Sequence, residues 1–348
     1  MTIALRLMTT VLLGLCTLAP AFAVAAKAEE YRFSIHHFLS PKAITHTKFL
    51  VPWAERVTRQ SGGRLKFEIF PSMTLGGKPP ELYRQVRDGT ADFVWTLPGY
   101  TPGVFPRLEV FELAGVHGGS AVATTEAIQD VLPMVAADLA DVKPILVHVH
   151  AGNALHLVSK DVKSLGDLRG MKLRSPSRTG VWMLQSWGAE PVGMPVPALP
   201  QALSKGTIDG ALIPFEVAVP LRIAELTSNS VELMNGRRFG TSVFLFAMNT
   251  ARYDALPDDL KKIIDDNSGA NISKGIGELW DSMEPVGKKR ATDLGKTVRA
   301  LSPETSAAFD APAKEVAERW TKEASARGID AKALLKAARD AIAKRSTK

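Results

Sequence analysis

Hydrophobic positions in the first hundred residues change their period from strand to helix and back again. Residues 31–35 alternate as in a strand, 43–60 carry apolar side chains at helical spacing, and 65–70 alternate once more. Residues 80–88 then read as a helix and 91–96 as a buried strand. A strand, a helix and a second strand in this order predict a right-handed crossover between parallel strands.

The same alternation resumes further along the chain. A long helical pattern covers 120–139, and strand-like segments follow at 144–150, 155–159, 172–174, 191–193 and 240–249. The remainder is almost wholly helical, over 257–268, 272–294, 303–327 and 331–345. The pattern predicts an α/β protein, and its length of 348 residues favours two lobes over one core. The helix through Trp280 is long enough to span both lobes.

The N-terminus has the pattern of an export signal. Arg6 precedes an apolar core over 7–18, and small residues around Ala23 offer a cleavage site, so residues 1–25 are expected to be removed. The alternative, a membrane anchor, needs a run of roughly 20 apolar residues, which this core does not reach. We therefore expect a periplasmic protein. The single cysteine, Cys16, lies within the signal, so no disulfide or cysteine metal site is expected in the mature chain.

The charge composition limits the classes of molecule that the protein is expected to bind. The formal charge is +7, but basic and acidic residues are interspersed and no basic aromatic motif is present, which argues against nucleic-acid binding. A positive surface attracts anions in general.

The most informative segment is 170–210. It reads Gly-Met-Lys-Leu-Arg-Ser-Pro from Gly170 and ends in Lys-Gly-Thr-Ile-Asp-Gly at Gly210. Arg174 follows a short strand in this segment, and a guanidinium presents a planar fork of donors that suits a carboxylate. The alternative is an arginine paired with an acidic residue on the surface of a lobe.

Several motifs in fixed order carry a resemblance to a known family. They are Leu-Gly-Gly at 75–77, Gln-Val-Arg-Asp-Gly-Thr-Ala-Asp at 85–92, Pro-Gly-Tyr at 98–100, Leu-Arg-Gly-Met-Lys-Leu-Arg at 168–174 and Lys-Gly-Thr-Ile-Asp-Gly at 205–210. Together they resemble the solute-binding subunits of tripartite ATP-independent periplasmic (TRAP) transporters, of the dicarboxylate-binding type.

The resemblance implies a two-lobed periplasmic binding protein with hinge strands, a long helix spanning both lobes and a ligand cleft between them. We expect lobe I to contain 26–151 and 240–279, and lobe II 152–239 and 280–348. The resemblance also implies that the protein delivers an organic acid to a small and a large integral-membrane subunit, with transport driven by a sodium gradient. We expect a monomer without a cofactor. In the family, the arginine at the position of Arg174 usually holds the substrate carboxylate.

Two departures from the family pattern bear on the ligand. A second arginine is frequent on the preceding strand, where this chain has Ala154 or Leu155, and a polar Asn is frequent shortly after the Asp-Gly pair, where it has Ile-Pro-Phe-Glu at 213–216. A cleft with fewer hydrogen-bonding groups disfavours sugar acids and favours an apolar body. We therefore expect an aromatic or hydrophobic monocarboxylate.

The candidate ligand-binding residues follow from these positions: Arg174, Arg178, His37, Phe38, Trp95, Asn153, His156, Pro214, Phe215 and Glu216. Each aromatic residue among them, and Trp182 beside them, has ordinary core packing as its alternative. Arg178 is either a second charge for the ligand or a capping residue that faces solvent, and His37 is either a donor to the carboxylate or structural.

Other functions are less well supported. His148 and His150 share one face of a strand, a spacing that suits a metal, but no carboxylate or cysteine accompanies them. No nucleophile motif is present, so no catalytic residue is assigned, although Glu216 would serve as a base in an exported enzyme. A sensor module that binds the same ligand is the other alternative.

Overall fold

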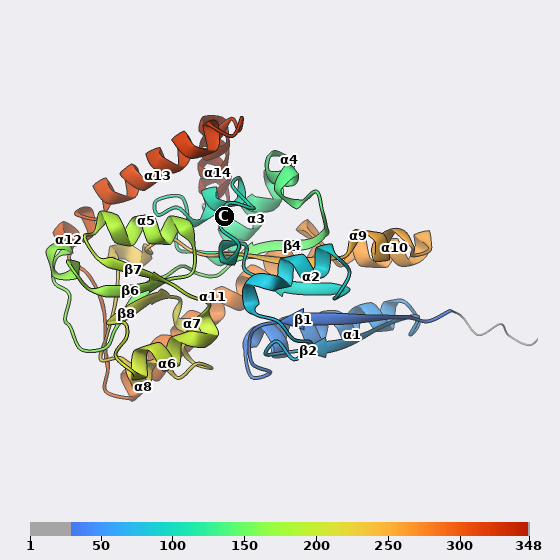
Figure 1. Cartoon of the computed structure of the whole chain (residues 1–348), viewed down its shortest axis with the longest axis horizontal. Coiled ribbons are helices and arrows are strands. Elements are labelled where there is room, and N and C mark those ends of the chain that lie inside the picture. The colour runs from blue at the N-terminus through green and yellow to red at the C-terminus, as the bar shows by residue number, and fades with distance from the viewer. Residues whose placement is uncertain (1–28, 347–348) are drawn as a thin grey trace, which may run out of the picture.

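The computed structural model describes residues 29–346, which fold around two β-sheets joined by a long helix (Figure 1). The predicted export signal lies outside the described residues. No described helix combines the length and the apolar character needed to cross a membrane.

The first sheet has five strands. Their order is β2 (Leu65–Phe70), β1 (Tyr31–His37), β3 (Phe93–Thr96), β10 (Val243–Met248) and β4 (Lys143–Val149). The β1 strand pairs in parallel with β2 and β3, which confirms the crossover predicted from the sequence. The β10 strand is antiparallel to both of its neighbours, so a late segment of the chain completes the centre of this sheet.

The second sheet has six strands. Their order is β11 (Thr297–Ala300), β9 (Asn229–Glu232), β5 (Ala154–Leu157), β8 (Gly210–Ile213), β6 (Lys172–Ser175) and β7 (Glu190–Gly193). The β5 strand is antiparallel to β8 and β9, whereas β6 is parallel to β7 and β8. The chain crosses between the sheets after β4, after β9 and along α11. We call the two halves the first-sheet unit and the second-sheet unit.

Helices cover both sheets. The main ones are α1 (Val51–Gln60), α2 (Leu82–Arg87), α3 (Ala121–Asp130), α5 (Arg178–Ser186), α6 (Leu199–Ser204), α10 (Asp258–Asp266), α11 (Ala270–Asp293), α13 (Asp310–Ser325) and α14 (Ala331–Ser346). Shorter ones are α4 (Leu132–Val135), α7 (Phe215–Ala218), α8 (Ile223–Leu226), α9 (Thr250–Asp254), α12 (Pro303–Ala307) and the 3-10 helices η3 (Pro98–Tyr100) and η4 (Leu108–Glu112). A π-helix, Thr45–Leu50, leads into α1.

The helix expected over 120–139 is interrupted in the structure. It ends at Asp130, and α4 begins at Leu132 with Pro133 in its first turn. Proline has no N–H to donate and clashes with the carbonyl four residues earlier, so a continuous helix through this position is disfavoured. Ser120 caps the start of α3 by accepting a hydrogen bond from the Ala123 N–H.

The long helix α11 packs on both units. Gly277 lies so close to Val122 of α3 that an added Cβ would come within 2.5 Å of its Cα, and at Gly287 an added Cβ would come within 2.2 Å of the Phe215 carbonyl oxygen on α7. Pro285 lies inside the helix between these two contacts. Glycine therefore permits the close approach of α11 to each unit.

The two C-terminal helices pack on different units. The α13 helix lies against α5, whereas α14 packs on α3 of the first-sheet unit. The C-terminal helix thus differs from the expectation that all of 280–348 belongs to the second lobe. Its packing is fixed in part by Arg345, which pairs with Glu126 and Asp130 of α3.

Candidate ligand-binding site

A cavity lies between the two sheets. Residues from β3 and β10 and from the segments after β1, β3 and β4 form one wall, and residues from β6 and β8 and from the segments after β6, β7 and β8 form the other. Ligands of open α/β sheets bind beyond the carboxyl ends of the strands, which is where most of these residues lie.

Arg174 on β6 is the main charged group of the cavity. Its residue is only 2% exposed, its Nε donates to the Met194 carbonyl at 3.0 Å, and its Nη1 donates to the Leu212 carbonyl at 3.2 Å. Its Nη2 is buried without a hydrogen-bond partner, and none of the residues in 29–346 forms an ion pair with it. Burying a charge without a counter-ion is costly, so the site is suited to an anion from outside the chain.

Three neutral polar groups accompany the arginine. His150 accepts the Gly152 N–H at Nδ1, at 2.9 Å, which leaves the ring proton on Nε2 as a donor. Burial holds the pKa of His150 well below its usual value, so the ring is neutral at pH 7. Asn153 has a buried Oδ1 without a partner, and the Tyr100 hydroxyl accepts the Val196 N–H at 2.8 Å.

Aromatic rings form much of the wall contributed by the first-sheet unit. Phe244 of β10 stacks on Trp95 of β3 with ring centroids 4.6 Å apart and an interplanar angle of 11°. Phe38 packs against Trp95 at 5.1 Å and against Tyr100 at 5.4 Å. All four rings line the cavity, which makes this wall flat, apolar and rigid.

One carboxyl group also lines the cavity. Glu216 at the start of α7 is 6% exposed, and its backbone N–H donates to Glu284 of α11 at 3.0 Å. Burial raises the pKa of Glu216 to about 8, with the neighbouring Glu284 carboxylate as the next cause. Pro214, which precedes it, lies in the same wall.

Four residues predicted from the sequence lie away from the cavity lining. His37 hydrogen-bonds His46 at 3.0 Å, and burial lowers the pKa of His37 to about 3. His156 hydrogen-bonds Ser230 at 2.9 Å and packs edge-on against Phe215, which is 1% exposed. The fourth, Arg178, is engaged in ion pairs.

Trp182 also lies away from the cavity. The guanidinium groups of Arg178 and Arg319 lie over its ring, at 4.6 Å and 4.2 Å from the centroid. The remaining predicted residues, Arg174, Phe38, Trp95, Asn153, Pro214 and Glu216, all line the cavity.

The sequence analysis did not select His150, Tyr100 or Phe244 as ligand contacts. Tyr100 could have been selected from the sequence, because it belongs to the Pro-Gly-Tyr motif. No sequence pattern identified Phe244, because its position depends on the insertion of β10 between β3 and β4. His150 was considered only as a metal ligand. Among residues 29–346, no three or more His, Cys, Asp or Glu side chains are placed to hold a metal ion.

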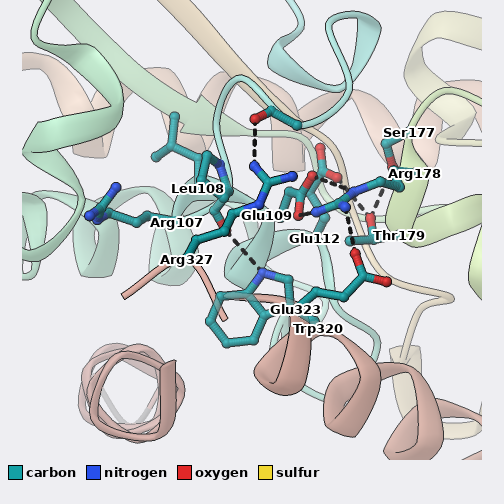
Figure 2. A network of polar contacts seen from close by, with 12 residues as sticks. Arg107, Leu108, Glu109, Glu112, Ser177, Arg178, Thr179, Trp320, Glu323 and Arg327 are labelled. Carbon is teal, nitrogen blue, oxygen red and sulfur yellow. Dashed lines mark hydrogen bonds and ion pairs between the residues drawn. The ribbon is translucent and has the colours of Figure 1, made fainter. Parts of the chain in front are cut away.

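A polar network beside the cavity joins the two units (Figure 2). Arg178 at the start of α5 donates from Nε to Glu109 Oε1 at 3.0 Å, from Nη2 to Glu109 Oε2 at 2.6 Å, and from Nη1 to Glu323 at 2.7 Å. Thr179 donates to Glu112 at 2.8 Å. Both Glu109 and Glu112 belong to η4 of the first-sheet unit.

The carboxyl groups of η4 are strongly buried. Burial, followed by the Glu109 carboxylate, raises the pKa of Glu112 to about 7. The helix α13 is held to the same segment, because the Trp320 indole donates to the Pro106 carbonyl at 3.0 Å and Arg327 donates to the Gly103 carbonyl at 2.8 Å. Hydrogen bonds from α5 and from α13 and the residues that follow it therefore hold the segment 103–112 from the side of the second-sheet unit.

Comparison with known proteins identifies the family to which this chain belongs. The family model for bacterial extracellular solute-binding proteins, family 7, matches residues 35–323. The outer membrane transporter protein TsaT of Comamonas testosteroni is 23% identical over 322 residues, which cover 91% of this chain and 94% of that protein.

Two solved structures are more similar. One is a TRAP solute-binding protein from a marine metagenome, specific for aromatic acid ligands and crystallised with 3-hydroxybenzoate. It is 44% identical, with a TM-score of 0.89, over 91% of this chain and 99% of that one. The other is a TRAP solute-binding protein of Rhodoferax ferrireducens with copurified benzoate, which is 39% identical with a TM-score of 0.88 over the same shares.

Proposed function

Because the chain belongs to family 7 of the bacterial extracellular solute-binding proteins, the solute receptors of TRAP transporters, we propose that it captures an aromatic monocarboxylate. The observation that carries the proposal is Arg174, a buried guanidinium with an unpartnered Nη2 in a cavity walled by aromatic rings. The arginine supplies one positive charge, and the walls supply surface for one flat ring.

The carboxylate is held at the Arg174 end of the cavity. A guanidinium hydrogen bond to a carboxylate is charge-assisted and stronger than one between neutral groups. The neutral His150 and Asn153 offer further hydrogen-bonding groups without adding charge. A single arginine with neutral neighbours balances one carboxylate, which favours a monoacid over a dicarboxylate.

The ring of the ligand packs against the aromatic wall of Phe38, Trp95, Tyr100 and Phe244. Burial of an aromatic ring is favourable by its area alone, and offset or edge-on contacts between rings add about 0.5–1.5 kcal/mol. Two relatives at 44% and 39% identity were crystallised with 3-hydroxybenzoate and benzoate, which supports the same ligand class.

The captured acid is delivered to a TRAP permease, for which we propose a small and a large membrane subunit and an exported, monomeric receptor with its signal removed. The two lobes that close on the acid are those expected from the sequence, with α14 moved to the first. Phe215, His156, His37 and Arg178 support the site from outside the cavity lining.

A binding experiment tests the ligand class. Ligand-stripped protein is titrated calorimetrically with benzoate, a C4 dicarboxylate and a sugar acid, in parallel with Arg174→Met. We expect benzoate to bind and the other two not to. Hydrogen bonds to charged groups contribute about 1.5–3 kcal/mol each, so the loss of one or two should weaken benzoate binding by roughly 10- to 10^4-fold.

The exposed Arg169, a few residues before Arg174 in sequence, provides a matched control. Arg169→Met removes the same charge from the protein and should bind benzoate within threefold of the wild type. Binding of the dicarboxylate alone, or full benzoate affinity in Arg174→Met, would contradict the proposal.

A further inference from the structure

Glu216 is a buried carboxyl group in a cavity that we assign to an anion. It lies in the first turn of α7, which follows β8 and Pro214, and it lines the same cavity as Arg174. None of the residues in 29–346 forms an ion pair with it. An ionised carboxylate here would face an incoming carboxylate ligand across an apolar space, which is unfavourable.

Two cations, Arg238 and Lys288, lie over the ring of the adjacent Phe215, and both are engaged by other carboxylates. Arg238 pairs with Glu232 at 2.9 Å and with Glu284 at 3.2 Å, and Lys288 pairs with Glu232 at 2.6 Å. Two positive and two negative groups thus form a balanced cluster behind α7. An ionised Glu216 would add a third negative charge without a counter-ion.

The other charged group in the cavity, Arg174, is the group that binds the ligand carboxylate. Once it is occupied, no positive charge in the cavity lining remains for Glu216, because His150 is neutral. A neutral carboxyl group offers one O–H donor and a carbonyl acceptor. A hydroxyl group can satisfy both, whereas a carbon–hydrogen edge of a ring satisfies neither.

We propose that Glu216, in its neutral form, hydrogen-bonds a hydroxyl substituent on the ring of the bound aromatic acid and so selects hydroxylated aromatic acids. This inference rests on the proposed function, since the ring is placed by Arg174 and the aromatic wall. The Trp280 indole can donate only to an acceptor oxygen of Glu216. An unsubstituted ring therefore leaves the O–H donor of the neutral carboxyl group without this partner, which is unfavourable for a buried polar group.

The test is calorimetric titration of the ligand-stripped protein with benzoate and the three hydroxybenzoate isomers. The variants are Glu216→Leu, Glu216→Gln and, as a control for loss of one acidic group, the exposed Glu190→Gln on β7. We expect the wild type and Glu190→Gln to bind at least one hydroxybenzoate about 5- to 100-fold more tightly than benzoate, which corresponds to about 1–3 kcal/mol.

The variants separate the hydrogen bond from the charge. Glu216→Leu should reduce this preference to within twofold while benzoate still binds. Glu216→Gln, whose amide both donates and accepts, should keep most of the preference. A tenfold loss of hydroxybenzoate affinity in Glu216→Gln would show that an ionised carboxylate is required and would overturn the neutral assignment.

Two further outcomes keep the inference separate from the proposed function. If the wild type binds benzoate but prefers no hydroxybenzoate, the role of Glu216 is refuted and the ligand class stands. If neither benzoate nor any hydroxybenzoate binds, the ligand class itself fails. An infrared band of a protonated carboxyl group that disappears in Glu216→Gln would support the neutral form even if Glu216→Leu does not fold.

Discussion

The network around Arg178 should stabilise the closed arrangement of the two units and thereby set affinity without contacting the ligand. Arg178 lies on α5 of the second-sheet unit, and Glu109 lies on η4 of the first. The side chains are 19% and 10% exposed, and two hydrogen bonds of 3.0 and 2.6 Å join them. The contact is bidentate (Figure 2), and the low exposure of both side chains shields it from most water.

Arg178→Met removes the bidentate pair and leaves the Glu109 carboxylate without its partner. Breaking a buried pair by removing one member costs about 3–5 kcal/mol, whereas the pair with Glu323, which is 35% exposed, contributes at most about 1 kcal/mol. Because the Arg178–Glu109 pair is only partly buried, we expect a loss of about 3 kcal/mol from the closed state. If the pair forms on closure, the Kd should rise about 100-fold.

The assay is calorimetric titration with benzoate and with the preferred hydroxybenzoate. Both affinities should fall by the same factor, since closure is common to all ligands. Arg319→Met is the matched control, because Arg319 lies over the same Trp182 ring and pairs with Glu323 but has no contact with Glu109. The control should bind within threefold of the wild type.

Two results would refute this reasoning. Benzoate binding by Arg178→Met within threefold of the wild type would show that the pair does not contribute to closure. A change in the ratio of the two affinities would instead indicate that Arg178 contacts the ligand, as one of the two sequence-based interpretations had it.

Three further predictions concern packing, the aromatic wall and pH. In α11, Gly287→Ala should lower the free energy of unfolding by about 1–3 kcal/mol in urea titrations, while the exposed Gly275→Ala, with open space around its Cα, should raise it by up to about 1 kcal/mol; equal effects would contradict the close approach. Trp95→Leu should weaken benzoate binding about tenfold, measured calorimetrically, because the Phe244 ring loses its stacking partner and the ligand loses a flat surface, whereas unchanged affinity would place the ring elsewhere. Ligand-free stability, followed by thermal unfolding, should peak near pH 6.5. The pKa values of Glu112, Glu216 and Glu284 are raised to about 7 to 8, so these groups contribute stability that is lost as the pH rises through those values. The buried histidines His117, His148 and His156, with pKa values of about 3 to 4, contribute stability that is lost as the pH falls below their unfolded pKa of about 6.5. A flat profile between pH 6.5 and 8 would refute the assignment of the glutamates.

Local patterns predicted the elements of the fold better than their arrangement. The parallel start of the first sheet followed from the period of the apolar residues between Tyr31 and Phe70. The insertion of β10 beside β3 joins segments about 150 residues apart and left no local signature. Phe244 was missed for this reason, because its place in the cavity depends on that long-range pairing. Trp95, at the end of an early strand, was selected.

The cavity residues divide in the same way. Arg174, Asn153 and Glu216 were selected because motif positions located them, and they line the cavity. The donor role of His150 depends on its contact with Gly152 and on a hydroxyl of Thr241, 91 residues away, and neither follows from the strand pattern. Whether a polar residue near the cleft faces the ligand or pairs with another side chain, as Arg178 does, is decided by tertiary contacts.

The close glycine contacts of α11 have a mechanical consequence. The helix packs closely on α3 at Gly277 and on α7 at Gly287. A rotation of either unit must therefore break one of these contacts or bend α11 between them. Pro285 lies in that interval and cannot donate to the carbonyl of Asp281, so the backbone there lacks one of its restraining bonds. The α11 helix therefore bends most easily between Gly277 and Gly287. Opening of the cavity should bend it there while both glycine contacts stay intact.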